Sequence, residues 1–490
     1  MKILFICDWD YALFWHPLAK KLKQSGFVDD CVALVVGKIY FDRLHDTNDG
    51  VFDKIYLLQD GIEQVPQHIH NLETRVSEIE QRYSKDTLWH FVWADRSWVR
   101  CSYEEIKKRI VCCFDYFESL YSSESPDLIL THGYSSMPHI ISHAVACKQD
   151  IKIFRHLSMR LGERFILSDN AMENESWISE YFTGVRSIRD STYKKVSDFL
   201  REFRNCGVSP GYSSMKKKRN RLTWGHVYRF IRYAYRYWIR RSFKNEHSKP
   251  NPLTRLWLDV NWRIRRTILS NSALWDRFDS EEKYVYFPLH VQPEASTMLL
   301  APYYLDQLSV LENISKSLPI GYRLVVKEHP SMLGRRAFGY YDRIKALSNT
   351  RLVFPFTDGF KIIQNSSAIV TITGTTGLEG LLYKKPVILL GSAYYRFCPL
   401  VTNASEVAPT QWPKLFAGVL NNYEHDEEIL IKFLGAVFER SFEGVYVEPL
   451  AALEKILASD NLDKYVEQVK YLFGKMQSKS FSGIAVDDLG

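Results

Sequence analysis

Three short motifs in the second half of the chain carry residue types that bind phosphate. Each follows a run of apolar residues: the first is Pro288–Thr297, the second Lys327–Pro330 and the third Thr373–Glu379. Histidine and lysine side chains donate hydrogen bonds to phosphate oxygens, and the free N–H groups at the start of a helix bind anions. Together the three motifs predict a nucleotide or nucleotide-sugar site.

The third motif is the most informative part of the chain. Its flanks, Ile369–Ile372 and Val387–Leu390, are short apolar runs that are typical of strands buried in a parallel sheet. Between them, Thr373–Gly377 places glycines and hydroxyl side chains where a helix begins. Another predicted strand, Leu324–Val326, leads directly into Lys327. Because the carboxyl ends of parallel strands share one edge of a sheet, we expect the motifs to meet there.

The same residues resemble a known protein family. QPEAST at Gln292–Thr297, KEHP at Lys327–Pro330 and TGTTGLEGLLYKKPVILLG at Thr373–Gly391 are similar to motifs of the capsular polysaccharide biosynthesis proteins. These proteins are relatives of the bacterial Kdo transferases, which have the two-domain GT-B fold. The resemblance covers roughly residues 283–400. It implies transfer of a sugar from a nucleotide donor, with a CMP-linked Kdo-type acid as one candidate, onto a capsule or surface polysaccharide.

The resemblance also implies roles for the residues of the motifs. His329 would hold a donor phosphate with added charge from Lys327, and Glu379 would accept hydrogen bonds from ribose hydroxyls. The threonine and glycine turn would bind the phosphate or the carboxylate of the sugar. The predicted substrate-binding residues are His290, Gln292, Lys327, His329, Pro330, Thr373, Gly374, Thr375, Thr376, Gly377 and Glu379. For each of them, a structural role as a loop residue, a helix cap or a surface charge is the alternative.

Glu294 is the candidate catalytic carboxylate of the second half. In the resembling transferases an acidic residue at this point faces the donor, so Glu294 could act as nucleophile, base or acceptor for a sugar hydroxyl. Those relatives carry two adjacent acids here, whereas this chain has Pro293 before Glu294. The difference leaves the role of Glu294 open.

Strand ends in the first half supply further catalytic candidates. Asp8 and His132 each follow an apolar run and would point into a cleft from the acceptor side. Weaker candidates at similar positions are Asp10, His16, Arg155 and His156. Asp8 and Asp10 alone are too few ligands for a metal ion, so the sequence predicts no metal site.

The elements that must position these residues alternate between strands and helices. Predicted strands at 2–7, 32–36, 54–58, 126–133 and 151–155 alternate with helices in the first half, and strands at 284–289, 322–326 and 351–354 lead to the third motif. This order is typical of parallel α/β sheets. We predict an α/β protein with two Rossmann-like domains (GT-B), 1–205 and 281–405, separated by a basic helical insertion, 206–280, and followed by C-terminal helices, 406–490.

The insertion has a composition of its own. Between Lys216 and Arg266 there are sixteen Lys and Arg but only two acidic residues, so this segment carries about +14 of a chain whose net charge is +7. Aromatic and aliphatic residues recur on one face of each of two predicted helices. One interpretation is a helical hairpin on the inner leaflet of a membrane. Another is a pair packed on the protein body and facing an anionic glycan or a lipid-linked acceptor; nucleic acid is the least favoured partner, and we predict none.

The overall composition is that of an ordinary globular protein, with 46% hydrophobic and 25% charged residues in 490. The eight cysteines are scattered without a CxxC pair, and no apolar run approaches the length of a membrane-spanning helix. We therefore expect a cytoplasmic protein, peripheral at the inner membrane face if the insertion binds lipid. The predicted function is a glycosyltransferase without a cofactor other than its donor. The alternatives are a sugar-nucleotide epimerase or hydrolase, or a non-catalytic component of capsule assembly or export.

Overall fold

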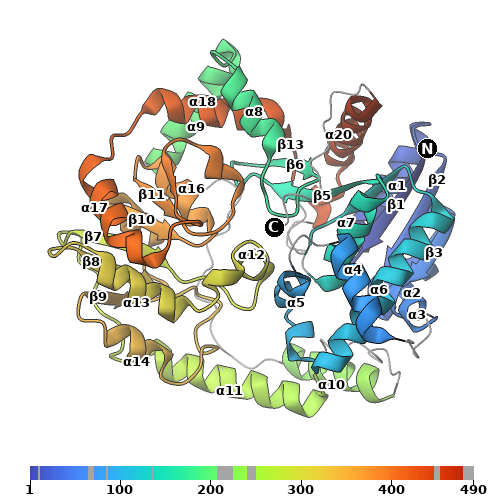
Figure 1. Cartoon of the computed structure of the whole chain (residues 1–490), viewed down its shortest axis with the longest axis horizontal. Helices are drawn as coiled ribbons and strands as arrows, with labels where there is room; N and C mark the ends of the chain where they lie inside the picture. The colour runs from blue at the N-terminus through green and yellow to red at the C-terminus, as the bar shows by residue number, and fades with distance from the viewer. Residues whose placement is uncertain are drawn as a thin grey trace. The chain divides into compact units, whose positions relative to one another are not determined.

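A computed structural model describes the chain except for residues 9–10, 65–70, 84–86, 135, 207–223, 240–249, 446–452 and 478–490. The chain divides into two compact units (Figure 1). Unit 1 comprises Met1–Met172, Arg236–Lys249 and Arg440–Gly490, and unit 2 comprises Glu173–Tyr235 and Pro250–Glu439. Each unit is built around its own mainly or wholly parallel sheet.

The sheet of unit 1 has the strand order β13-β6-β5-β4-β1-β2-β3. Five strands are parallel, and β6 and β13 pair antiparallel at one side. β1 is buried almost throughout because its residues, KILFIC, are apolar after the first lysine. The strands are β1 (Lys2–Cys7), β2 (Asp30–Val35), β3 (Lys54–Leu57), β4 (Leu128–Thr131), β5 (Lys152–Ser158), β6 (Arg164–Ser168) and β13 (Phe442–Glu443).

Helices of unit 1 come from both ends of the chain. Trp15, Phe14 and Tyr465 join one core cluster, with Tyr465 contributed by the C-terminal helix α20. The helices are α1 (Ala12–Gln24), α2 (Lys38–Thr47), α3 (Leu58–Gln64), α4 (Leu72–Tyr83), α5 (Trp89–Ala94), α6 (Tyr103–Glu124), α7 (Met137–Lys148), α19 (Leu453–Ile456) and α20 (Ser459–Gln477).

The sheet of unit 2 is wholly parallel, with the strand order β12-β11-β10-β7-β8-β9. Read from β9 to β12 and counted along the chain within this unit, the order is third, second, first, fourth, fifth, sixth, which is the doubly wound order of dinucleotide-binding domains. The strands are β7 (Tyr284–Pro288), β8 (Arg323–Lys327), β9 (Thr350–Val353), β10 (Ala368–Thr371), β11 (Val387–Leu389) and β12 (Val401–Asn403).

The helices of unit 2 include α11 and most of α10, the two basic helices of the insertion. Trp412 and Phe416 of α17 are fully buried in its core. The helices are α8 (Ser176–Gly184), α9 (Asp190–Cys206), α10 (Trp224–Trp238), α11 (Pro252–Ser270), α12 (Ala295–Met298), α13 (Gln307–Ser317), α14 (Tyr340–Lys345), α15 (Gly359–Asn365), α16 (Thr375–Leu382), α17 (Trp412–Asn422) and α18 (Glu427–Arg440). None of the helices described is long and apolar enough to cross a bilayer.

The predicted fold class, an α/β protein with two Rossmann-like domains, a helical insertion and a helical C-terminus, is confirmed. The division of the chain differs from the predicted one. The first segment of unit 1 ends at Met172 instead of about residue 205, and unit 1 also contains the later segments Arg236–Lys249 and Arg440–Gly490. The reason is local: Arg204 of α9 donates to the Leu382 carbonyl and pairs with Glu427, which places α9 in unit 2.

Candidate functional site

The predicted motifs meet where the strand order of unit 2 reverses. β7 and β10 are neighbours in the sheet, but β8 follows β7 on one side and β11 follows β10 on the other. The loops that leave the carboxyl ends of β7 and β10 therefore diverge, and ligands of doubly wound sheets bind in that crevice. We refer to the loops 288–297, 327–336 and 372–379 together as the donor edge.

His290 joins two loops of the donor edge. The Thr373 N–H donates to its Nε2 at 3.3 Å, and its own N–H donates to Gln307 Oε1 at 2.8 Å. Burial lowers the pKa of the imidazole to about 3, with the positive charge of Arg336 acting in the same direction. His290 is therefore neutral at physiological pH and accepts through Nε2, so it aligns the β7 and β10 loops.

The Thr373–Gly377 turn is closely packed on its inner side. A Cβ on Gly374 would lie 2.8 Å from Thr371 Oγ1 and 3.0 Å from His290 Nε2, so only glycine fits. The Thr373 hydroxyl donates to the Ser296 carbonyl at 2.8 Å and is thereby used within the protein. Within the part of the chain that the structure describes, the N–H groups of Thr375 and Thr376 have no hydrogen-bond partner. They open α16 at the position where the sequence predicts anion binding, and this role stays a prediction.

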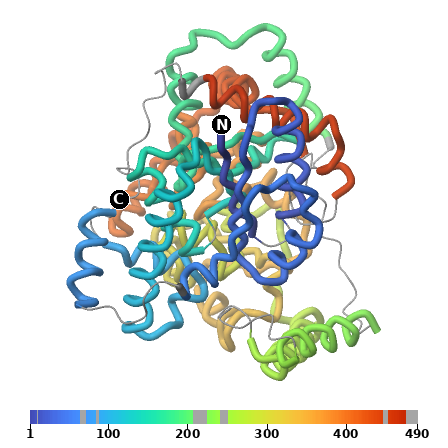
Figure 2. Tube along the Cα trace, turned by 90° about the vertical axis from the view of Figure 1, so that its right-hand side faces the viewer, coloured from blue at the N-terminus to red at the C-terminus, as the bar shows by residue number. Residues whose placement is uncertain are grey.

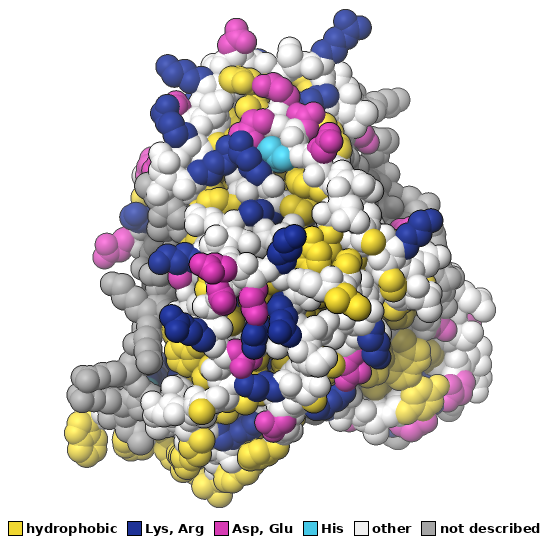
Figure 3. All heavy atoms as spheres, turned by 90° about the vertical axis from the view of Figure 1, so that its left-hand side faces the viewer, with side chains coloured by type: hydrophobic (Ala, Val, Ile, Leu, Met, Phe, Trp, Pro, Cys, Tyr) yellow, Lys and Arg dark blue, Asp and Glu magenta, His cyan; other side chains and the backbone are white. Residues whose placement is uncertain are grey.

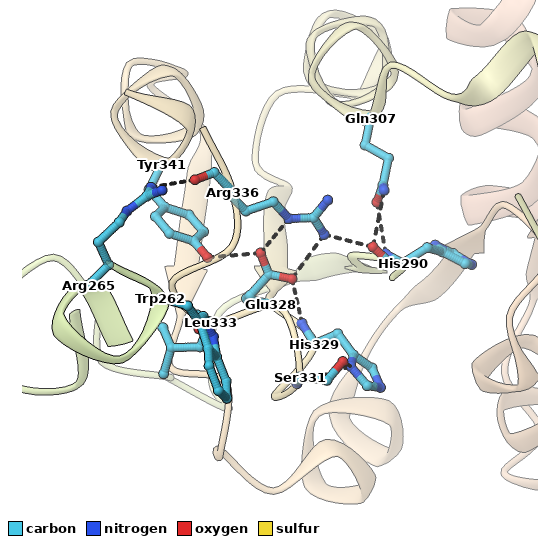
Figure 4. A network of polar contacts seen from close by, with 10 residues as sticks. All are labelled: Trp262, Arg265, His290, Gln307, Glu328, His329, Ser331, Leu333, Arg336 and Tyr341. Atoms are coloured by element: carbon cyan, nitrogen blue, oxygen red, sulfur yellow. Dashed lines mark hydrogen bonds and ion pairs between the residues drawn. The ribbon is translucent and has the colours of Figure 1, made fainter. Parts of the chain in front are cut away.

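A buried ion pair supports the second loop (Figure 4). Glu328 is completely buried, and both of its oxygens accept hydrogen bonds from Arg336, at 2.8 and 3.0 Å. Tyr341 donates to the same carboxylate at 3.0 Å, and the His329 N–H donates to it at 2.7 Å. Arg336 also donates to the His290 carbonyl at 2.7 Å. The pair therefore connects the β7 loop to the β8 loop.

Glu328 lies in the KEHP motif, but no role was predicted for it from the sequence. Arg336, Gln307 and Tyr341 were not predicted as site residues. A carboxylate at the end of a buried strand with an arginine eight residues later is a weak signal. Only the fold shows that the two side chains meet.

Among the described residues, only one ring nitrogen of His329, Nδ1, has a hydrogen-bond partner. Its Nδ1 accepts a hydrogen bond from the Ser331 N–H at 3.3 Å, and the Ser331 hydroxyl lies 2.7 Å from the same nitrogen. Burial lowers the pKa of His329, so the ring is neutral and its proton resides on Nε2. This tautomer makes Nε2 a hydrogen-bond donor.

Lys327 and Glu379 interact electrostatically at the donor edge. Burial raises the pKa of Glu379 to about 7, although the positive charge of Lys327 opposes that shift. Burial likewise lowers the pKa of Lys327, while Glu328 and Glu379 raise it. Neither group has an ion-pair partner within 4 Å in the described part of the chain. A ligand with both a phosphate and hydroxyl groups could pair with Lys327 through the phosphate and with Glu379 through the hydroxyls.

The remaining predicted residues of unit 2 lie in the same loops. Glu294 is exposed at the start of α12 and accepts from the Ser296 hydroxyl at 3.1 Å. Gln292 donates to the Leu305 carbonyl at 2.6 Å, so it stabilises its own loop. The Pro330 carbonyl accepts from Arg266 of α11 at 3.4 Å.

In unit 1, Asp8 and His132 come together with a third residue, His139. One ligand atom from each of the three lies within 4.8 Å of the others. His139 was missed because it lies inside α7, where a histidine gives no sequence signal of its own. Asp10 lies outside the described residues. His16 contacts Asp49 at 3.0 Å, Arg155 donates to the Asn170 carbonyl and His156 contacts Tyr465. These three side chains therefore bind residues outside the Asp8, His132 and His139 cluster.

Comparison with known proteins agrees with the motif analysis. Residues 198–414 match the family model of capsule polysaccharide biosynthesis proteins. The predicted resemblance to that family is thereby confirmed.

Two curated relatives match part of the chain. Protein FixF of Sinorhizobium fredii is 28% identical over 193 residues, which cover 37% of this chain and 44% of that protein. The capsule polysaccharide export protein KpsS of Escherichia coli is 23% identical over 252 residues, 48% of this chain and 62% of KpsS. The chain thus spans about half the length of these relatives.

Among solved structures, the β-Kdo 2,7 transferase of Thermosulfurimonas dismutans KpsC is similar with 13% identity. The alignment covers 76% of this chain and 98% of that chain, with a TM-score of 0.39.

Proposed function

We propose that this chain, which resembles the capsule polysaccharide biosynthesis proteins over residues 198–414, transfers a sugar from a nucleotide donor onto a capsule or other surface polysaccharide. The donor nucleotide binds at the donor edge of unit 2. A CMP-linked Kdo-type acid is the donor we test first, and a glycan or a lipid-linked glycan is the acceptor.

The observation that carries this proposal is the convergence of anion-binding groups at the strand-order reversal of unit 2. His329 presents a neutral Nε2–H, α16 presents two N–H groups that have no partner in the described part of the chain, and Lys327 adds a positive charge. Such groups stabilise the charge that develops on a departing nucleotide phosphate. Glu379, half-ionised near neutral pH, then accepts from ribose hydroxyls.

For the chemical step, three residues remain candidates. Glu294 stands in the β7 loop at the donor edge, where it would act on the sugar as nucleophile, base or hydroxyl acceptor. Asp8 and His132 in unit 1 are candidates for activating the acceptor hydroxyl.

The first test is a thermal-shift screen of the purified protein against CMP, CDP, UDP, GDP and their sugars. A ligand present at 100 times its dissociation constant adds about 2.7 kcal/mol to stability, which raises the melting temperature measurably. We expect one nucleotide class to stabilise the protein, and His329→Ala and Lys327→Met to abolish the response. His45→Ala and Lys361→Met, which change exposed residues elsewhere, should retain it.

The same experiment separates the alternatives. A response to UDP or GDP alone would discard the CMP-linked donor and keep the transferase. Silence towards every nucleotide from a folded sample would overturn the proposal and favour a non-catalytic assembly component. A product assay with a glycan acceptor then separates the reactions: if the bound nucleotide sugar is only hydrolysed or epimerised, transfer is not the reaction.

We also propose that α10 and α11 bind the anionic inner leaflet of a membrane. Figure 2 shows these helices side by side, and the Tyr233 hydroxyl donates to the Pro250 carbonyl between them. Both present large apolar side chains to solvent: Trp224 is 87% exposed and Trp257 63% exposed. Other members of this exposed set are Tyr228, Ile231, Leu253, Val260, Ile264 and Ile268.

Charge and chemistry favour a bilayer as the occupant of this surface. Figure 3 shows hydrophobic and basic side chains gathered along the lower end of the unit 2 face. The exposed arginines include Arg229, Arg232 and Arg255. Tryptophan and tyrosine beside arginine suit the interface of an anionic membrane, where each basic residue near the surface contributes about 1 kcal/mol. Residues 216–223 and 240–249 of the predicted basic segment lie outside the described residues.

Vesicle co-sedimentation tests this partner. We expect binding to phosphatidylglycerol vesicles that weakens with salt and is much lower for phosphatidylcholine. The double variant Leu253→Glu/Trp257→Glu should lose it, whereas Ile320→Glu, at another fully exposed apolar residue, should not. Equal binding by all three proteins, or none by the wild type, would rule out this membrane surface.

A further inference from the structure

The cluster of Asp8, His132 and His139 in unit 1 has the geometry of a ligand set. β1 and β4 are adjacent and parallel, with Ile6 opposite Thr131, so Asp8 and His132 leave the same edge of the sheet. α7 begins a few residues later and contributes His139. His139 Nε2 lies 3.9 Å from Asp8 Oδ2, and one ligand atom from each of the three residues lies within 4.8 Å of the others.

Two nitrogens of this cluster are buried and lack hydrogen-bond partners in the described structure. They are His132 Nδ1 and His139 Nε2. His139 is 2% exposed and Asp8 7% exposed, so water has little access to either side chain. A buried polar group without a partner costs about 1–3 kcal/mol, and in native proteins it usually indicates an ordered water or an ion.

Neighbouring contacts hold His139 in the orientation of a ligand. The Ser136 hydroxyl lies 2.6 Å from His139 Nδ1, which turns Nε2 towards Asp8. The start of α7 is fixed because the Met137 N–H donates to the buried Asp95 carboxylate at 2.8 Å. Tyr11 stacks on His132 with 4.2 Å between the ring centroids. Contacts of this kind orient histidine ligands in metal sites.

We infer that Asp8, His132 and His139 bind a divalent first-row transition-metal ion, with Zn²⁺ as the expected species. Two imidazoles and one carboxylate suit Zn²⁺, Co²⁺, Mn²⁺ or Fe²⁺, whereas Mg²⁺ and Ca²⁺ prefer oxygen ligands throughout. Three protein ligands leave a fourth position open, which is the arrangement of catalytic zinc sites. This site lies in unit 1 and does not depend on a nucleotide at the donor edge.

The inference changes the role of His132 if the proposed transferase reaction holds. As metal ligands, Asp8 and His132 would position the ion and would not act as the base. A hydroxyl in the open position would lose its proton more readily, because a bound Zn²⁺ lowers the pKa of coordinated water to about 7.

Direct metal binding tests the site without reference to activity. Protein freed of metal with a chelator is titrated calorimetrically with Zn²⁺, Co²⁺ and Mg²⁺, and Co²⁺ is also followed by its visible absorption. We expect one Zn²⁺ or Co²⁺ per chain, no heat with Mg²⁺, and affinity at least about 10-fold weaker in His139→Gln and Asp8→Asn. His143→Gln is the control, because His143 lies one turn further along α7 and contacts the Asp169 carbonyl instead.

Absence of one-to-one Zn²⁺ or Co²⁺ binding by the wild-type protein would overturn the inference, whether or not the variants fold. Unchanged affinity in both ligand variants, with circular dichroism showing that they are folded, would also overturn it. The nucleotide thermal-shift response is measured on the same samples. A protein that binds nucleotide but no metal refutes only the metal site, and one that binds metal but no nucleotide refutes only the donor site.

Discussion

At the scale of single residues, the second loop of the donor edge is held in place by the completely buried carboxylate of Glu328. Glu328 is compensated by Arg336, Tyr341 and the His329 N–H, so its charge is neutralised by specific partners and not by water. A buried pair of this kind contributes little net stability, but removing one partner strands the other charge. The pair therefore acts mainly by fixing the loop that carries His329.

Arg336→Met should destabilise the protein by about 3–5 kcal/mol, because it leaves Glu328 ionised and unpaired in the core. Arg343→Ala removes an exposed pair with Glu312 and should cost less than about 1 kcal/mol. Urea unfolding measures both values. Equal losses in the two variants would show that burial of Glu328 is not what makes its partner important.

Glu379 gives the protein a pH dependence with a defined sign. Its folded pKa of about 7 lies above the ordinary value of 4.5, so the folded state holds the proton more tightly than the unfolded chain. The stability from this group is fully present below about pH 4.5 and is lost as pH rises through 7. Glu379→Gln should therefore match the wild type near pH 4 and be more stable at pH 8, by up to roughly 3 kcal/mol.

Thermal unfolding at several pH values, without nucleotide, measures this difference. Glu406→Gln, at an exposed carboxylate, serves as the control and should show no such crossover. A Glu379→Gln variant that is less stable than the wild type at pH 8 would contradict the burial argument.

At the scale of elements, α11 is fixed to the second loop of the donor edge. The Trp262 indole donates to the Leu333 carbonyl at 2.9 Å, and Arg266 donates to the Pro330 carbonyl. Gly334 permits this approach: its φ is +87°, and a Cβ there would lie 2.8 Å from the Arg266 nitrogen. The helix that we propose to bind lipid therefore contacts the loop that carries His329.

Gly334→Ala should destabilise the protein more than Gly321→Ala. Both glycines have positive φ, but the Cβ of Gly321 would meet nothing within 4 Å, so its substitution adds backbone strain alone, about 1–3 kcal/mol. Gly334→Ala adds a collision with the backbone of α11 to the same strain. Hydrogen exchange of the α11 amides should increase in Gly334→Ala only, and equal exchange in both variants would show that the close contact is unimportant.

The strand-end elements could be predicted from the sequence because short apolar runs and Gly or Thr turns are local signals. β7, β8 and β10 end within a residue or two of their predicted positions, and the turn at Gly374 starts a helix as expected. β6 and β13 were not predicted, because their pairing joins Phe165 to Phe442 and no local pattern encodes it. The same reason explains why Arg336 and His139 were missed: each is defined by a partner that only the fold brings near.

At the scale of the whole molecule, carboxylates on α18 connect distant segments of unit 2. Partial burial opposes ionisation of Glu427, but hydrogen bonds from Arg204 and His425 outweigh it and lower its pKa to about 2. Glu439 is likewise opposed by burial, and bonds from Tyr181 and Thr192 lower its pKa to about 2. The stability that the ionised Glu427 and Glu439 contribute is present above the ordinary carboxyl pKa of 4.5 and is lost as pH falls towards 2.

The double variant Glu427→Gln/Glu439→Gln should thus be less stable than the wild type at pH 7, with a difference that disappears towards pH 2. Urea unfolding across this pH range measures it. Glu424→Gln, at an exposed neighbouring carboxylate, should behave like the wild type throughout. A difference that persists undiminished at pH 2 would mean that packing, and not charge, is responsible.

Unit 1 is completed by the last part of the chain. β13 pairs with β6, and Tyr465 of α20 stacks on Phe165 with 4.0 Å between ring centroids and contacts His156. During synthesis on the ribosome, Met1–Met172 emerges first, and all of Glu173–Glu439 must be translated before these partners exist. At about 5–20 residues per second this takes on the order of tens of seconds, longer than most domains need to fold. For that interval we expect the nascent first half to expose the β6 edge and the apolar residues that α20 later covers.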